Sequence, residues 1–350
     1  MQVSERTQEF SKKLLGIYTG GVLTKMIDIG HQTGLFGAAA QGPGTSQQLA
    51  DRAGLQERYV REWLGGMTTA GIFTYDPAAK LYTLPPEHAL LLSGESARNT
   101  APMSGVIDHF GQHLPKLIRC FREGGGIPYS EYQPEFSRHM HAVWRRIYDE
   151  QLIDGFLGQV EALRERLAGG MSVLDVGCGT GHAINLMARE YPSSRFVGCD
   201  LAEDAIASAK SEAGQMALSN ARFEILDVAK LPATPKYELI TAFDAIHDQL
   251  DPAGVLQRVY EALEDDGTFL MIDFKFASNV EDNIGNPFAP MYYGISLMHC
   301  MTVSLACGGA GLGAVWGIET ARRMLADAGF SRVIVEDSPR PQNCIYVCRK

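Results

Sequence analysis

The sequence VLDVGCGTG at residues 173–181 contains a short apolar strand and, directly after it, a glycine-rich turn. No other feature of the chain constrains its fold as much. The run predicts a strand that ends near a carboxylate and a helix that begins directly after the turn. Glycine lacks a Cβ and can adopt φ > 0, so such a turn lets bare backbone approach a ligand closely. The pattern therefore predicts an α/β domain whose first strand leads into a site for a nucleotide-like ligand.

The spacing of these glycines narrows the choice of ligand. A dinucleotide fingerprint reads G-x-G-x-x-G, but His182 stands where its third glycine would be, and the extra glycine lies one residue earlier, at Gly181. The resulting D-x-G-x-G-x-G pattern resembles motif I of the class I S-adenosylmethionine-dependent methyltransferases. That cofactor has no phosphate, and its ammonium group suits the carboxylate of Asp175.

Two further acids follow predicted strands at the spacing that this resemblance requires. Asp200 follows a strand at 195–199, about 20 residues after the turn, where such folds place the acid that binds ribose hydroxyls. Asp227 follows a strand at 222–226, and the resemblance implies that it reads the adenine amino group. A single Asp of this kind is more often a helix cap or a turn residue. Together with the turn, they predict an S-adenosyl-L-methionine site formed by Asp175, Gly177, Cys178, Gly179, Gly181, Asp200, Leu201, Asp227, Val228, Phe243 and Asp244.

Strand and helix patterns alternate after residue 171, which indicates a parallel, doubly wound sheet. The last two apolar segments, 332–337 and 343–348, are joined by too few residues for a helical crossover, so the final strand must return antiparallel. We therefore expect a Rossmann-like, seven-stranded methyltransferase sheet with an antiparallel last strand, preceded by a mainly helical winged-helix domain.

The first half of the chain shows helix, turn, helix and hairpin patterns in the order of a winged helix. We expect a winged-helix and dimerisation domain at 1–95, a helical connector and lid at 96–170, and the methyltransferase domain at 171–350. This order resembles the two-domain small-molecule O-methyltransferases of plants and bacteria, which implies a homodimer and a small-molecule methyl acceptor. The alternative is a methyltransferase-fold transcriptional regulator that binds DNA through its winged helix. The net charge of −10 and pI near 5.4 disfavour a nucleic-acid partner.

His247 is the candidate catalytic residue. It follows the predicted fourth strand, at the rim where ligands bind in such sheets. The resemblance implies a general base, although Gln249 replaces the tryptophan that commonly follows the His-Asp pair, and a cofactor or substrate contact is equally open. The insertion after the fifth strand predicts an apolar or aromatic acceptor pocket, with ordinary helix packing as the alternative. Its candidate residues are Tyr292, Tyr293, Met298 and His299.

The remaining patterns exclude several classes of site. The pairs His109 and His113, and His139 and His141, lack further ligands at a usual spacing, so we expect no metal. Seven scattered cysteines indicate reduced thiols rather than a disulfide framework. The chain shows no signal peptide and no apolar run of membrane-spanning length, which predicts a cytoplasmic protein. The sequence leaves open the identity of the acceptor and whether it accepts the methyl group on O, N, C or S.

Overall fold

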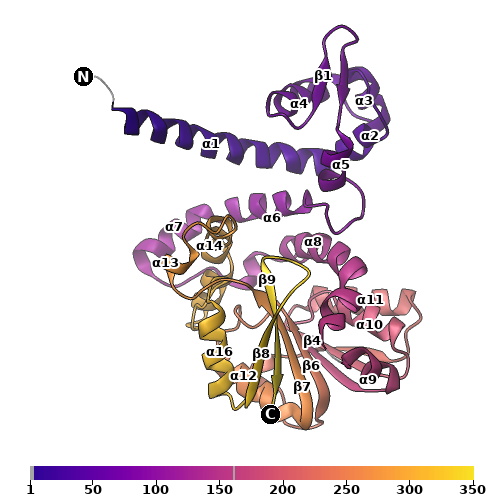
Figure 1. Ribbon diagram of the computed structural model, residues 1–350, viewed down its shortest axis with the longest axis vertical. Coiled ribbons are helices and arrows are strands. Elements are labelled where there is room, and N and C mark those ends of the chain that lie inside the picture. Colours follow the sequence, from indigo (N-terminus) through magenta and orange to yellow (C-terminus); the bar gives the residue numbers. More distant parts are fainter. Residues whose placement is uncertain (1–3, 161) are drawn as a thin grey trace. The chain divides into compact units, whose positions relative to one another are not determined.

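The structure is a computed structural model that describes residues 4–160 and 162–350 (Figure 1). The chain forms two compact units, Met1–Gly111 and Gln112–Lys350. The predicted connector at 96–170 is thus divided between them, with its first part in the unit of the winged helix. Within the described part of the chain, none of the helices combines the length and the apolar character that a membrane crossing requires.

The first unit has the predicted winged-helix order. Its elements are α1 (Glu5–Gln32), α2 (Leu35–Ala40), α3 (Ser46–Ala53), α4 (Glu57–Thr69), β1 (Thr74–Asp76), β2 (Leu81–Thr83), α5 (Pro86–Leu92) and α6 (Pro102–Gly111). Helix α3 begins with a capping box between Thr45 and Gln48 and ends at Gly54, which has φ of +68°. Strands β1 and β2 form the antiparallel wing. Trp63 of α4 anchors the core of this unit through edge contacts with the rings of Phe36 and Phe73.

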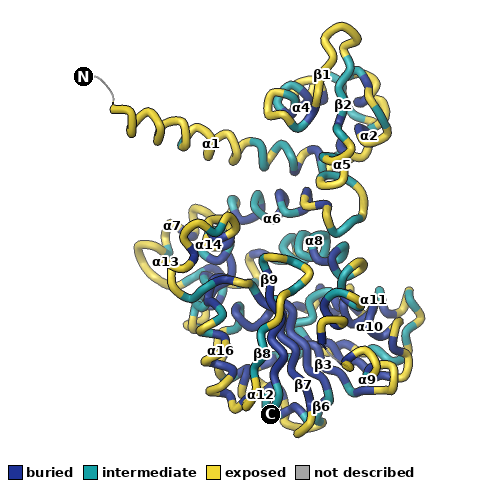
Figure 2. Tube along the Cα trace, viewed as in Figure 1, coloured by how far each residue is buried: buried dark blue, intermediate teal, exposed yellow. Residues whose placement is uncertain are grey.

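Helix α1 carries apolar side chains that the first unit does not bury (Figure 2). Most of its length is exposed, including large side chains that are at least half exposed: Phe10, Leu15, Ile17, Tyr18, Val22 and Ile29. An exposed apolar surface of this size usually marks an interaction site.

The second unit is an α/β domain. Its helices are α7 (Leu114–Glu123), α8 (Glu135–Gln151), α9 (Leu163–Gly169), α10 (His182–Glu190), α11 (Glu203–Gln215), α12 (Pro252–Ala262), α13 (Val280–Asn283), α14 (Ala289–Met298), α15 (Cys300–Ala306) and α16 (Ile318–Asp327). Its strands are β3 (Ser172–Val176), β4 (Arg195–Asp200), β5 (Ala221–Ile225), β6 (Tyr237–Phe243), β7 (Leu263–Phe274), β8 (Arg332–Asp337) and β9 (Asn343–Arg349).

The seven strands form one sheet in the order β5-β4-β3-β6-β7-β9-β8. The pairs from β5 to β7 are parallel, and β9 runs antiparallel to both of its neighbours. Helices α9, α10 and α11 cover one face of this sheet, and α12 and α16 cover the other (Figure 1). Its central strands are buried on both faces, as parallel sheets are. The predicted fold class, including the reversed last strand, is confirmed.

Candidate active site

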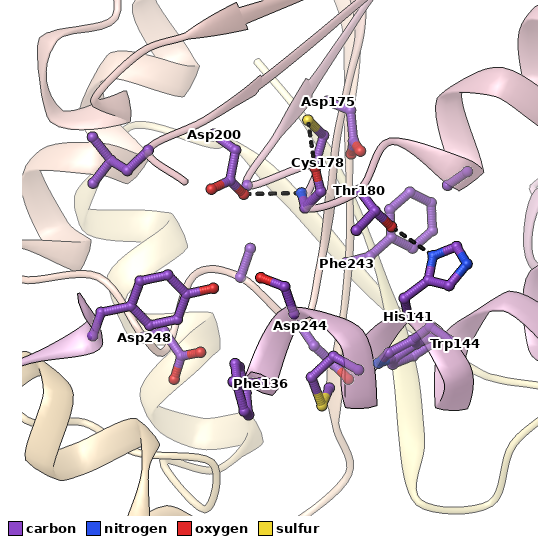
Figure 3. A pocket seen from close by; sticks show the side chains of 18 of the residues that line it. Phe136, His141, Trp144, Asp175, Cys178, Thr180, Asp200, Phe243, Asp244 and Asp248 are labelled. Atoms are coloured by element: carbon purple, nitrogen blue, oxygen red, sulfur yellow. Dashed lines mark hydrogen bonds between the residues drawn. The ribbon is translucent and has the colours of Figure 1, made fainter. Parts of the chain in front are cut away.

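The second unit encloses a cavity of about 370 Å³ at the carboxyl ends of β3, β4 and β6 (Figure 3). This volume is in the range of small-molecule sites, and the carboxyl edge is where ligands bind in open α/β sheets. The glycine turn forms one wall and helix α8 forms another. Carboxylates from three strand ends surround the space, with Asp175, Asp200, Asp244 and Asp248 all facing it.

The glycine turn adopts the geometry that its sequence predicts. Gly177, Gly179 and Gly181 have φ of 71°, 53° and 71°, a region that favours glycine. A Cβ on Gly177 would lie 2.6 Å from the Cβ of Ala245, and one on Gly181 would lie 2.5 Å from the Phe223 ring. A Cβ on Gly179 would meet nothing within 4 Å. The outer two glycines are therefore required by the protein itself, whereas Gly179 leaves open space at the cavity.

Asp200 joins the end of β4 to this turn. One carboxylate oxygen accepts a hydrogen bond from Gly179 N at 2.9 Å, and the other accepts one from Ala202 N at 2.9 Å. An ionised carboxylate offers about four acceptor positions, so capacity remains for ligand hydroxyls. Burial raises the pKa of Asp200, and the backbone donors oppose this shift.

Asp175 is 2 % exposed at the end of β3 and accepts a hydrogen bond from the Thr241 hydroxyl at 2.6 Å. Burial raises its pKa to about 7. Asp244, which follows β6, adopts φ of 48° and accepts a hydrogen bond from the Asn343 amide at 3.1 Å. Burial, followed by the charge of Asp273, raises the pKa of Asp244 to about 8. Neither carboxyl group forms an ion pair with a described residue, although the charges of His247 and Arg340 oppose the rise in the pKa of Asp244. Both groups suit a cationic ligand.

The other predicted cofactor residues divide into two groups. Cys178, Leu201, Val228 and Phe243 line the cavity. Asp227 is not among the described residues that line it. Its carboxylate instead accepts a hydrogen bond from Ala229 N at 3.1 Å and pairs with Lys230 at 3.0 Å, which makes it the cap of a short 3-10 helix. Asp227 thus has the role of a helix cap, which is the alternative interpretation of a single Asp at the end of a strand.

Helix α8 contributes a wall that the motifs did not predict. Trp144 and Tyr148 stack with ring centroids 5.1 Å apart and both line the cavity. His141, on the same helix, is hydrogen-bonded to the Thr180 hydroxyl of the glycine turn at 2.9 Å. The available signal was the spacing of these side chains by three and four residues on one amphipathic helix.

His247 is buried behind Asp248, which lines the cavity. The side chain is 2 % exposed, and Nδ1 lies 2.9 Å from Asp273 Oδ1 and 3.1 Å from Oδ2. Burial alone would lower the pKa of His247, but Asp273 and Asp248 outweigh it and hold that pKa well above its usual range. His247 is also not among the described residues that line the cavity. A general base must reach the proton of the acceptor. His247 approaches the cavity at Asp248, so its role as a base or as a ligand contact stays a prediction.

Two known domain families match the chain. Residues 21–94 match the Rv2258c-like winged HTH domain, and residues 167–329 match the Methyltransferase domain. This is a winged-helix protein with a methyltransferase domain.

The methyltransferase domain has relatives of known name. Trans-aconitate 2-methyltransferase from Variovorax paradoxus is 32% identical over 127 residues, which are 36% of this chain and 46% of that protein. Malonyl-[acyl-carrier protein] O-methyltransferase from Acetivibrio thermocellus is 28% identical over 104 residues, 30% of this chain and 36% of that protein. The chain thus spans less than half the length of these curated relatives.

Human N-acetylserotonin methyltransferase, solved in complex with SAM, resembles the whole chain. The TM-score is 0.72, the identity is 16%, and the likeness covers 100% of this chain and 99% of that chain. At this identity the likeness shows a common fold, in which a winged helix precedes the methyltransferase sheet.

The insertion of the methyltransferase domain brings one of its four predicted acceptor residues to the cavity. His299 lines the cavity, with its ring stacked on Phe136 at 3.9 Å between centroids. Tyr292 is buried against Phe274 and Phe276. Tyr293 is 38% exposed, and Met298 offers its carbonyl oxygen to the Tyr132 hydroxyl at 2.6 Å. Tyr292, Tyr293 and Met298 are not among the described residues that line the cavity. These residues of α14 make contacts with the rest of the protein instead.

Proposed function

We propose that the protein is an S-adenosyl-L-methionine-dependent methyltransferase that acts on a small molecule, at a hydroxyl group. The observation that carries this proposal is the convergence of the glycine turn with Asp175, Asp200 and Asp244 around one cavity. The combination fits a cationic, ribose-bearing cofactor without phosphates.

Each part of that cofactor has a counterpart among the lining residues. The ammonium group would meet the carboxylates of Asp175 and Asp244, which form no ion pair with the described residues. The ribose hydroxyls would donate to Asp200. The adenine would lie between Leu201 and Val228, which both line the cavity. Gly179 would let the amino acid portion approach the backbone.

The acceptor would occupy the space toward α8 and the junction of α14 and α15. Aromatic side chains predominate there, including Tyr129, Phe136 and Trp144. They favour an apolar or aromatic compound of small size. Methyl transfer from a sulfonium is an in-line displacement, so the main tasks of this wall are to align the acceptor and to exclude water.

The test combines binding with product analysis. We expect the purified protein to bind S-adenosylhomocysteine in calorimetry and to transfer a labelled methyl group from S-adenosylmethionine to a phenol within a panel of phenols, amines and thiols. Methyl transfer only to amines or thiols would overturn the hydroxyl assignment. A protein that binds neither form of the cofactor would overturn the proposed activity.

We also propose that the apolar surface of α1, defined by Phe10, Leu15, Ile17, Tyr18, Val22 and Ile29, pairs with a second copy of the chain. Such a surface on an otherwise polar helix is costly to leave in water. Light scattering should report a dimer, and the double variant Leu15→Ser with Tyr18→Ser should shift it toward a monomer. The matched control Lys12→Ser with Lys13→Ser should remain dimeric.

The charges of α4 give little support to the alternative function, a transcriptional regulator that binds DNA through its winged helix. Arg58 pairs with Glu62 at 2.6 Å, and Arg61 pairs with Glu57 at 3.4 Å. Phosphate binding needs cations that are available to DNA. A gel shift with duplex DNA at moderate salt is therefore expected to be negative.

A further inference from the structure

Three metal-ligating side chains converge beside the cavity, in a cluster that the cofactor site does not use. They are His247, Asp248 and Cys300, and one donor atom from each lies within 4.8 Å of the others. His247 and Cys300 are 2% and 5% exposed. Asp248 belongs to the cavity wall, so the cluster is buried on one side and reaches the cavity on the other.

The separation between His247 and Asp248 fits two ligands of one metal better than a hydrogen bond. Nε2 lies 3.4 Å from Asp248 Oδ1, whereas a charge-assisted N–H···O bond is about 2.7 to 2.9 Å long. Two tetrahedral ligands that are each about 2.0 Å from a zinc ion lie about 3.3 Å apart. Asp248 Oδ1 is buried and has no hydrogen-bond partner among the described residues.

The opposite side of the imidazole has the support that metal-bound histidines have. Nδ1 lies 2.9 Å from the fully buried carboxylate of Asp273. A carboxylate in that position fixes the ring and its tautomer, so that Nε2 presents its lone pair to a metal. Asp273 itself is held by the Phe274 backbone N–H, which donates to Oδ1 at 2.7 Å.

We propose that His247 Nε2, Asp248 Oδ1 and Cys300 Sγ bind a zinc ion. A nitrogen, an oxygen and a thiolate sulfur are a common ligand set for zinc, and three protein ligands leave a fourth position for water or a ligand oxygen. The ion would also compensate the two carboxylates, Asp248 and Asp273, that flank the buried imidazole.

The zinc site has a further use that rests on the proposed function. Because Asp248 lies at the cavity wall, an acceptor hydroxyl could take the fourth position. Zinc would lower the pKa of a bound hydroxyl group, whose proton would pass to water. The oxygen would then form a bond to the sulfonium methyl group as the S–CH₃ bond breaks and S-adenosylhomocysteine leaves. In this step the metal would supply the activation that a hydroxyl acceptor needs.

The experiment measures metal in the untagged protein. After incubation with zinc chloride and desalting, we expect about one zinc per chain by mass spectrometry of the metal. Replacement by Co²⁺ should give the near-ultraviolet charge-transfer band of a cobalt thiolate. Cys300→Ser should abolish that band and weaken zinc binding at least tenfold. Cys307→Ser, an exposed thiol outside the cluster, should change neither.

Three results would overturn the site: less than about 0.1 zinc per chain, a cobalt complex without a thiolate band, or a band that survives Cys300→Ser. If Cys300→Ser does not fold, the zinc content and the cobalt spectrum of the natural protein still decide. Calorimetry with S-adenosylhomocysteine on the same sample separates the two proposals. Cofactor binding without zinc removes the metal site alone, and zinc without cofactor binding removes the proposed function alone.

Discussion

Acidic side chains gather in two regions of the second unit: at the glycine turn, and around the cluster of His247, Asp248 and Cys300. The two regions differ in how the negative charge is compensated. At the turn, Asp175 and Asp244 form no ion pair with a described residue, and their pKa values are raised to about 7 and about 8. Beside the cluster, Asp273 is fully buried, and His247 Nδ1 lies 2.9 Å from its carboxylate. Uncompensated acids at a cavity indicate that a ligand supplies the charge, whereas compensated acids belong to the internal structure.

Removal of the internal carboxylate tests this contrast most strongly. We expect Asp273→Asn to lower the free energy of unfolding by about 3 to 5 kcal/mol, because it leaves the buried His247 without its charged partner. Denaturant titration measures the change. Asp337→Asn, which removes only a surface partner of Lys275, should cost less than about 1 kcal/mol. Equal effects of the two substitutions would show that the buried pair has no special weight.

A ligand-facing carboxylate should instead affect binding. Asp200→Ala removes the acceptor expected for two ribose hydroxyls, and hydrogen bonds to a charged group contribute about 1.5 to 3 kcal/mol. The affinity for S-adenosylhomocysteine should therefore fall at least tenfold in calorimetry, whereas Asp204→Ala on the exposed side of α11 should leave it unchanged. Unaltered affinity in Asp200→Ala would contradict the assignment of this residue.

The pH dependence of binding gives the next effect in size. Asp175 has a pKa of about 7 when the cavity is empty, so it is mostly neutral below that pH and mostly ionised above it. A ligand ammonium group favours the ionised form, so affinity should rise about tenfold between pH 6 and pH 8. Asp244 titrates in the same direction. Asp175→Asn should flatten the curve, and an affinity that falls as pH rises would refute the proposed contact.

The smallest effect is expected at Tyr293. This side chain is partly exposed and lies outside the described lining of the cavity, with its hydroxyl 3.5 Å from the Asn283 amide. Tyr293→Phe should change the KM for the acceptor less than about twofold, within the range of surface substitutions. His299→Phe should raise that KM more, because His299 lines the cavity. A larger effect of Tyr293→Phe than of His299→Phe on this KM would indicate that the acceptor binds nearer to α14.

The sequence predicted the glycine turn and the carboxylates beside it, because local rules govern both. A turn that needs φ > 0 at three positions can hardly be built without glycine, and the end of a parallel strand places its next side chain at the edge of the sheet. The positions of Gly177, Asp175 and Asp200 therefore follow from their places in the chain. The alternation of strands and helices likewise predicted a parallel, doubly wound sheet, although not the order of its strands.

The remaining residues depend on contacts between distant segments, which no local pattern contains. The direction of His247, in the turn after β6, is set by Asp273, and the cluster includes Cys300 from the distant helix α15. Spacing rules for metal ligands cannot find such a set, because they describe ligands on one turn or one helix. Tyr292 likewise has an apolar pattern that fits the core and a cavity equally well, and packing against Phe274 decides between them.

The place of β9 in the sheet has a consequence for the order of events during synthesis. Asn343–Arg349 lies between β7 and β8, so the sheet cannot close before this late segment has left the ribosome. The winged-helix unit precedes it by more than two hundred residues and can fold much earlier. Until β9 arrives, β7 and β8 keep unpaired edges that invite association with other chains. Asp244 also lacks its Asn343 partner during that interval, so the nascent chain completes its binding site only as it completes its sheet.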